Sequence, residues 1–219
     1  MMKSNSPTAK LYLFLIAVLG CFSLLTQFYL SIESGLAPPH IVFFRYFAYF
    51  TITTNLLVAI TCVVLLLAPN SRLGEFIGRQ KTLTATTSYI LVVGIIYNVL
   101  LRIIWKPEGL QLIVNELLHA VIPILFLIYW LVFVRKDGLK WNDIWPWLLY
   151  PLIYTIYVFI FGAITGFYPY HFIDLAQLGL KTTIINACGI TIFFIVISLL
   201  LVGISKLYKK PISGNHSAV

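Results

Sequence analysis

The chain has 219 residues, of which 60% are hydrophobic and only 10% are charged, and its mean hydropathy is +0.96. Soluble globular domains carry about 25% charged residues, so this composition excludes that class and indicates a membrane protein. The formal net charge of +8 comes from basic residues scattered over several segments. We therefore expect no single basic face of the kind that binds nucleic acid.

Six apolar runs follow one another along the chain, each of roughly 20 residues and so long enough to cross a ~30 Å hydrocarbon core as a helix. They lie at about residues 11–32, 42–67, 83–105, 113–134, 144–167 and 184–207. The runs are continuous rather than alternating, which excludes the strands of a membrane β-barrel. The sequence thus predicts an all-α protein in which residues 1–219 form a single six-helix transmembrane domain.

The second run is less uniform than the others. Arg45 stands near its start, and four polar residues lie between Thr51 and Asn55. A long arginine side chain near a helix end can reach the headgroups while its stem stays in the apolar region. Leucine and valine then resume, so we expect one continuous span over residues 42–67.

The basic residues predict the orientation. With six crossings both termini share one side, and the Lys and Arg residues on that side are Lys3, Lys10, Arg72, Arg79, Lys81, Arg135, Lys136, Lys140, Lys206, Lys209 and Lys210. The remaining four are Arg45, Arg102, Lys106 and Lys181. By the positive-inside rule the side with more basic residues is cytoplasmic, so both termini are expected there.

Polar residues in two of the runs are expected to meet. Offsets of three and four residues lie about 60° and 40° apart on a helix, which places Asn115, Glu116 and His119 on one side of the fourth run. Thr51 and Asn55 form a similar stripe, one turn apart, on the second run. Both runs cross from outside to inside, so the two stripes are expected to face each other in the outer half of the membrane.

Such a meeting indicates nucleophilic chemistry. A threonine hydroxyl becomes a good nucleophile when a neighbouring base takes its proton, and histidine is the usual base. Burial in the bundle disfavours imidazolium, which keeps the ring neutral and able to accept a proton. Thr51 is therefore the candidate nucleophile, and His119 is its candidate base.

Polar neighbours suggest helper roles. Glu116 is a candidate to orient the imidazole or to stabilise its protonated form. Three amides are candidates to donate to a developing oxyanion: Asn55, Asn98 and Asn115. Arg45 and Arg102, near the outer rim, are candidates to hold a fatty-acid carboxylate, although anchoring at the headgroups explains them equally well.

Three short motifs stand in order on the second, fourth and fifth runs: Phe50-Thr51, Asn115-x-x-x-His119 followed by Pro123, and Gly166-Phe-Tyr168-Pro169. With these motifs the chain resembles, from the second run onward, the androgen-induced family of membrane-embedded threonine hydrolases, and more closely a related family of small bacterial six-span proteins. The resemblance implies that Thr51 is the nucleophile, that His119 is its base, and that the substrates are fatty acid esters of hydroxy fatty acids. It also implies a bacterial cytoplasmic membrane. The chain departs from the animal pattern at Glu116, where that family has a second histidine.

The loop from Tyr168 to Asp174 is aromatic and is expected on the outer side, where tyrosine rings favour the headgroup level. A sharper hypothesis is that Pro169 turns the chain so that the loop caps the polar cavity. His171 and Asp174 would then lie at the mouth of the cavity.

Other functions stay open at this point. Glu116-x-x-His119 matches one half of a di-iron motif, but the second pair and the further carboxylates are missing from the other runs, so neither a metal nor a cofactor is expected. The polar stripes would also suit a small transporter. In a structural or partner-binding subunit they would only fasten helices together. The sequence predicts no oligomeric state.

Overall fold

The computed structural model describes residues 6–207, most of which are helical and none of which form a strand. Within these residues six segments are long and apolar enough to cross a membrane: Pro7–Glu33, Phe50–Leu67, Gln80–Leu101, Gly109–Phe133, Trp141–Thr165 and Leu175–Leu207. The prediction of an all-α protein with six membrane-length helices is confirmed. The chain is therefore treated as an integral membrane protein.

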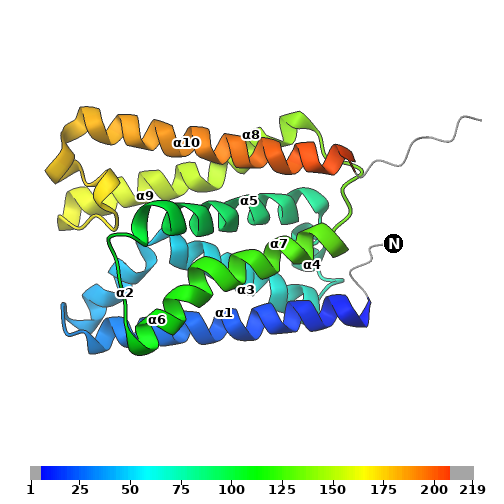
Figure 1. The fold of residues 1–219 in the computed structure, drawn as a ribbon, viewed down its shortest axis with the longest axis horizontal. Helices are drawn as coiled ribbons and strands as arrows, with labels where there is room; N and C mark the ends of the chain where they lie inside the picture. Colours follow the sequence, from blue (N-terminus) through cyan, green and yellow to red (C-terminus); the bar gives the residue numbers. More distant parts are fainter. Residues whose placement is uncertain (1–5, 208–219) are drawn as a thin grey trace, which may run out of the picture.

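The helices pack side by side in one bundle (Figure 1). Helix α1 (Pro7–Glu33) packs against α3 (Phe50–Leu67) and α7 (Ile122–Phe133). Helix α5 (Gln80–Ile96) contacts α3, α7 and α10 (Leu175–Leu207), so it is the central element. Helix α1 begins and α10 ends at the same end of the bundle, as an even number of crossings requires.

Shorter elements complete the chain. They are α2 (Pro39–Phe47), α4 (Arg72–Ile77), the π-helical turn η2 (Tyr97–Leu101), α6 (Gly109–Glu116), the π-helical turn η3 (Leu117–Val121), η4 (Trp141–Asp143), α8 (Ile144–Trp147), α9 (Leu149–Thr165) and η5 (His171–Ile173). Two of the six spans therefore contain a π turn. Such turns are rare in helices and are frequent at functional sites.

Small hydroxyl residues line the buried central helix. Thr84 and Thr87 each donate to the carbonyl four residues earlier, at 2.6 and 2.7 Å, which satisfies the hydroxyls without water. Ser88 and Ser198 join α5 to α10 at 2.8 Å, and the indole nitrogen of Trp130 donates to Thr84 at 2.8 Å. These contacts fasten neighbouring helices to α5 in an environment where unsatisfied polar groups are costly.

The expectation of one continuous span over residues 42–67 is wrong. Tyr49 has an extended backbone (φ −82°, ψ 124°), and it separates α2 from α3. The Tyr154 hydroxyl of α9 donates to the Ala48 carbonyl at 2.7 Å and so satisfies a group at the break. As a result Thr51 lies in the first turn of α3 rather than in the middle of a long helix.

Most of the basic residues that predict the orientation lie within the described part of the chain, and three do not. Lys3, Lys209 and Lys210 lie outside the described residues. Arg79 and Arg135 lie together at one pocket, beside the short loops that join α4 to α5 and α7 to η4. The assignment of that end to the cytoplasm stays a prediction.

Candidate active site

Thr51 and His119, predicted as a pair from the sequence, lie in contact. The Thr51 Oγ1 atom is 3.2 Å from His119 Nε2, and Nδ1 of the same ring is 2.9 Å from the Asn115 carbonyl oxygen. A carbonyl oxygen only accepts, so the proton of the neutral ring is on Nδ1. The lone pair of Nε2 therefore faces the Thr51 hydroxyl, which is the arrangement that a general base requires.

An aromatic ring that the sequence analysis missed holds the imidazole in place. Tyr97 stacks on His119, with ring centroids 3.9 Å apart and an interplanar angle of 25°. The buried Asn115 side chain donates to the Tyr97 hydroxyl at 2.6 Å. Asn115 was expected to donate to an oxyanion, but its amide nitrogen donates instead to the hydroxyl of Tyr97, the residue that stacks on His119.

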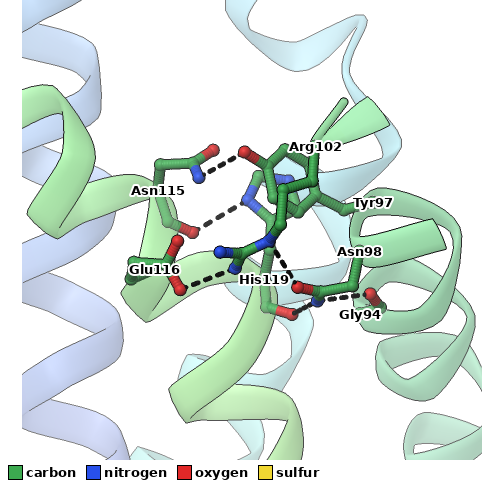
Figure 2. A network of polar contacts seen from close by, with 7 residues as sticks. All are labelled: Gly94, Tyr97, Asn98, Arg102, Asn115, Glu116 and His119. Carbon is green, nitrogen blue, oxygen red and sulfur yellow. Dashed lines mark hydrogen bonds and ion pairs between the residues drawn. The ribbon is translucent and has the colours of Figure 1, made fainter. Parts of the chain in front are cut away.

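A polar network beside His119 ties the two π turns together (Figure 2). The Asn98 amide nitrogen donates to the carbonyls of Gly94 and His119, at 2.8 and 3.0 Å. Arg102 donates from Nε to Asn98 Oδ1 at 2.8 Å and from Nη2 to Glu116 Oε2 at 2.7 Å. The chain of contacts from Glu116 through Arg102 and Asn98 therefore ends on the His119 backbone.

Two sequence predictions change with this network. Glu116 makes its contact with Arg102 and does not hydrogen-bond the imidazole, so the Asn115 carbonyl orients the ring instead. Arg102, a candidate for binding a substrate carboxylate, already has the Glu116 carboxylate as its partner. Both side chains remain partly exposed, at 44% for Arg102 and 34% for Glu116.

Asn55 lies one turn from Thr51 on α3 and joins this helix to η3. Its amide nitrogen donates to the Thr51 carbonyl at 2.9 Å and to the Leu118 carbonyl at 3.2 Å. Both of its N–H groups are thus used on the backbone, in contrast to the oxyanion role expected for this residue. Asn55 fixes the distance between α3 and η3, and with it the distance between Thr51 and His119.

Arg45, the other candidate carboxylate ligand, lies in the last turn of α2. Its guanidinium carbon is 4.7 Å from the centre of the Phe167 ring, a cation–π contact between α2 and the loop that follows α9. Among the described residues its Nε atom is buried and has no hydrogen-bond partner.

A cavity of about 550 Å³ reaches Thr51. Its wall includes Thr51, while most of the other lining residues are apolar side chains of α5, α8, α9 and α10. On α9 the lining residues lie between Leu149 and Thr155, so the cavity lies beside the first half of this helix. Leu149 and Leu152 both line the cavity and are more than half exposed, so the cavity borders the lipid-facing surface at the start of α9.

The aromatic loop after α9 contributes to the wall of this cavity, through residues other than the two that were expected at its mouth. Tyr170, Phe172 and Ile173 line the cavity wall. His171 is exposed and Asp174 accepts from two backbone amides in the first turn of α10, so these two residues serve the surface and a helix cap. Nothing in the sequence separated Tyr170 from the neighbouring tyrosine of the same loop.

No group of three or more His, Cys, Asp and Glu side chains within residues 6–207 is arranged to hold a metal ion. Comparison of the chain with models of known families, with curated proteins and with solved structures finds no match.

Proposed function

We propose that the protein is a membrane-embedded hydrolase of fatty acyl esters, with Thr51 as the nucleophile and His119 as its base. The observation that carries the proposal is the 3.2 Å contact between Thr51 Oγ1 and His119 Nε2 on the wall of an apolar cavity. A hydroxyl, an unprotonated imidazole nitrogen and a pocket for hydrocarbon are the three parts that such a reaction needs.

The reaction proceeds in two halves. His119 Nε2 takes the hydroxyl proton while Thr51 Oγ1 bonds to the ester carbonyl carbon, and the carbonyl electron pair moves to its oxygen. The tetrahedral intermediate collapses, the ester C–O bond breaks, and the leaving alkoxide takes the proton from His119. A water molecule then attacks the acyl-threonine with His119 again as base, which releases the fatty acid and restores the Thr51 hydroxyl.

The cavity supports an acyl substrate in particular. Its volume of about 550 Å³ lies within the usual range for small-molecule sites, roughly 300–1,000 Å³. Its apolar lining and its position beside the lipid-facing start of α9 suit a hydrocarbon chain that enters from the bilayer. The more specific substrate class, fatty acid esters of hydroxy fatty acids, rests on the resemblance of the motifs.

The proposal extends to location. We place the protein in a bacterial cytoplasmic membrane with both termini on the cytoplasmic side, on the resemblance to small bacterial six-span proteins and on the distribution of Lys and Arg. The aromatic loop after α9 then faces outward, and the site lies in the outer half of the bilayer.

A fluorophosphonate probe tests the nucleophile in the purified protein. Wild type is expected to be labelled at Thr51, identified by mass spectrometry of the modified peptide, and to hydrolyse a fatty acid ester of a hydroxy fatty acid. Thr51→Ala and His119→Ala are expected to lose labelling and turnover while keeping the thermal unfolding of wild type. Thr53→Ala is the matched control, since it removes a hydroxyl of the same helix that contacts Tyr150.

The alternatives give different results. If Thr51→Ala hydrolysed the ester at the wild-type rate, Thr51 would not be the nucleophile. Flux of a solute in proteoliposomes without ester cleavage would indicate a transporter. If the wild-type protein hydrolysed no ester, and Thr51→Ala and His119→Ala only lowered its stability, the polar residues would serve to join helices.

A further inference from the structure

Tyr170 is held in a fixed position above the nucleophile by the loop that follows α9. Its ring stacks on Phe172 with centroids 5.1 Å apart and meets the edge of Tyr49 at 5.8 Å. The Asn186 side chain of α10 donates to the Phe172 carbonyl at 2.8 Å and anchors the loop. These contacts leave the Tyr170 hydroxyl directed at α3.

The hydroxyl of Tyr170 contacts Thr51 at two atoms. The backbone N–H of Thr51 donates to the phenol oxygen at 3.3 Å, and Thr51 Oγ1 lies 3.5 Å from the same oxygen. The Thr51 amide is in the first turn of α3, where backbone N–H groups lack an acceptor within the helix. Because the Thr51 hydroxyl proton is directed to His119, the proton of the phenol is the one available to point toward Oγ1.

The same position lies next to the charge that develops during acyl transfer. When Thr51 Oγ1 adds to an ester carbonyl, the oxyanion forms on the carbon bonded to Oγ1. An effective donor lies roughly 2.7–3.1 Å from the place that the oxyanion occupies. The Tyr170 hydroxyl lies 3.5 Å from Oγ1 on the cavity wall where the acyl group must lie, so an oxyanion two bonds away from Oγ1 forms close to this hydroxyl.

We propose that Tyr170 is a catalytic residue, whose hydroxyl donates a hydrogen bond to the oxyanion of the tetrahedral intermediate formed at Thr51. This inference rests on the proposed hydrolase function and assigns to the capping loop a part in the chemistry. It also replaces the three asparagines that the sequence suggested for this role, since the structure directs their amide groups to protein oxygens.

The protonation state of Tyr170 supports the assignment. Burial, partly offset by its contacts with Thr51, raises the pKa of Tyr170 to about 12. The phenol is therefore protonated at neutral pH and acts as a donor. The first turn of α3 adds a partial positive charge on the same side of the nucleophile.

The primary test is Tyr170→Phe in the full-length protein, with a p-nitrophenyl fatty ester as substrate. Loss of one oxyanion donor is expected to lower kcat by about 10²-fold. KM is expected to change by less than threefold, because the donor acts mainly on the transition state. A trifluoromethyl ketone that forms a tetrahedral adduct with Thr51 should lose affinity in parallel, while a non-reactive ether analogue should bind as it does to wild type.

Tyr168→Phe is the matched control in the same loop, because the Tyr168 ring packs against Gly162 and not on the nucleophile. It is expected to keep kcat within threefold of wild type. A second variant has fluorinated tyrosine at position 170, which keeps the ring and the hydroxyl but lowers the pKa of the phenol. Its activity should fall as the pH rises through that pKa, because the phenolate cannot donate a hydrogen bond. A residue with a purely structural role would not show this pH profile.

The outcomes separate this inference from the proposed function. Full activity in Tyr170→Phe together with inactive Thr51→Ala would refute the role of Tyr170 and leave the hydrolase intact. Equal loss of affinity for the ketone and the ether analogue would also refute it, because the residue would then act in ground-state binding. Wild-type turnover by Thr51→Ala would instead refute the nucleophile itself.

Discussion

The backbone of Gly94 lies against the backbone of His119. A Cβ atom on Gly94 would come within 3.1 Å of the His119 carbonyl oxygen and within 3.1 Å of the Pro123 Cβ atom. Both neighbours belong to rigid parts of the chain, a main-chain carbonyl and a proline ring, so neither gives way easily. The absence of a side chain at residue 94 is what allows α5 to approach the π turn that carries the histidine.

Gly94→Ala is therefore expected to displace His119 by a few tenths of an ångström and to lower kcat about tenfold, since a shift of 1 Å costs about 10²-fold. The measurement is ester hydrolysis by the purified variant. Gly189→Ala on α10 is the control, because no atom lies within 4 Å of its added Cβ. Wild-type kcat in Gly94→Ala would show that the site tolerates the displacement.

Tyr97 contributes to the site through its ring and through its hydroxyl, and two variants separate the contributions. Tyr97→Phe leaves the buried Asn115 donor without its partner, which is expected to cost about 1–3 kcal/mol of unfolding free energy with little change in kcat. Tyr97→Leu removes the stack on His119 and should lower kcat as well. Thermal unfolding and turnover are compared with Tyr157→Phe on the exposed side of α9. Equal kcat in the two Tyr97 variants would contradict a role for the stack.

The ion pair between Arg102 and Glu116 acts on His119 at a distance. Glu116→Gln and Arg102→Gln are each expected to lower kcat by no more than about fivefold, because the pair is partly exposed, and Arg102→Gln should have the larger effect because it also removes the contact with Asn98. The double variant should be no worse than Arg102→Gln alone, since Arg102→Gln already removes the contact with Glu116 together with the contact with Asn98. Arg135→Gln, whose partner is Asp137, controls for loss of an arginine. A much larger loss in Glu116→Gln than in Arg102→Gln would instead favour direct action of the carboxylate on the imidazole.

The cavity beside α9 is expected to set the length of the acyl chain. Ala187→Phe places a ring in the cavity wall and should raise KM for long-chain esters about tenfold while short-chain esters are hydrolysed as before. Cys188→Phe is the matched control, because the adjacent Cys188 is exposed and does not line the cavity. An identical chain-length profile for the two variants would argue that the acyl chain lies elsewhere.

The orientation is tested with single cysteines in a background in which Cys21, Cys62 and Cys188 are replaced by alanine. Asn70 and Glu108 are exposed and lie at opposite ends of the bundle. A membrane-impermeant maleimide applied to intact cells is expected to label Cys at position 108, and to label Cys at position 70 only after permeabilisation, because the positive-inside rule places residue 70 in the cytoplasm. The reverse pattern would overturn the orientation and place the site in the inner half of the membrane.

The sequence by itself determined the helical architecture and predicted that Thr51 and His119 meet. Six apolar runs long enough to cross a bilayer dictate six helices, because the backbone satisfies its hydrogen bonds in lipid only as a helix or a closed barrel. An imidazole in one run and a hydroxyl in another were enough to predict the pair Thr51 and His119. The polar stripe on each run follows from 3.6 residues per turn alone, and it requires no knowledge of the neighbouring helices.

The tertiary structure decided everything that depends on contacts between elements distant in the chain. The break at Tyr49 has no glycine or proline to announce it, and it is supported by a hydroxyl from α9. The partner of Glu116 and the choice of Tyr170 over Tyr168 depend on which side chains the packed helices bring within hydrogen-bond distance. Local periodicity fixes which face of a helix a residue occupies, whereas packing across the bundle determines what that residue touches.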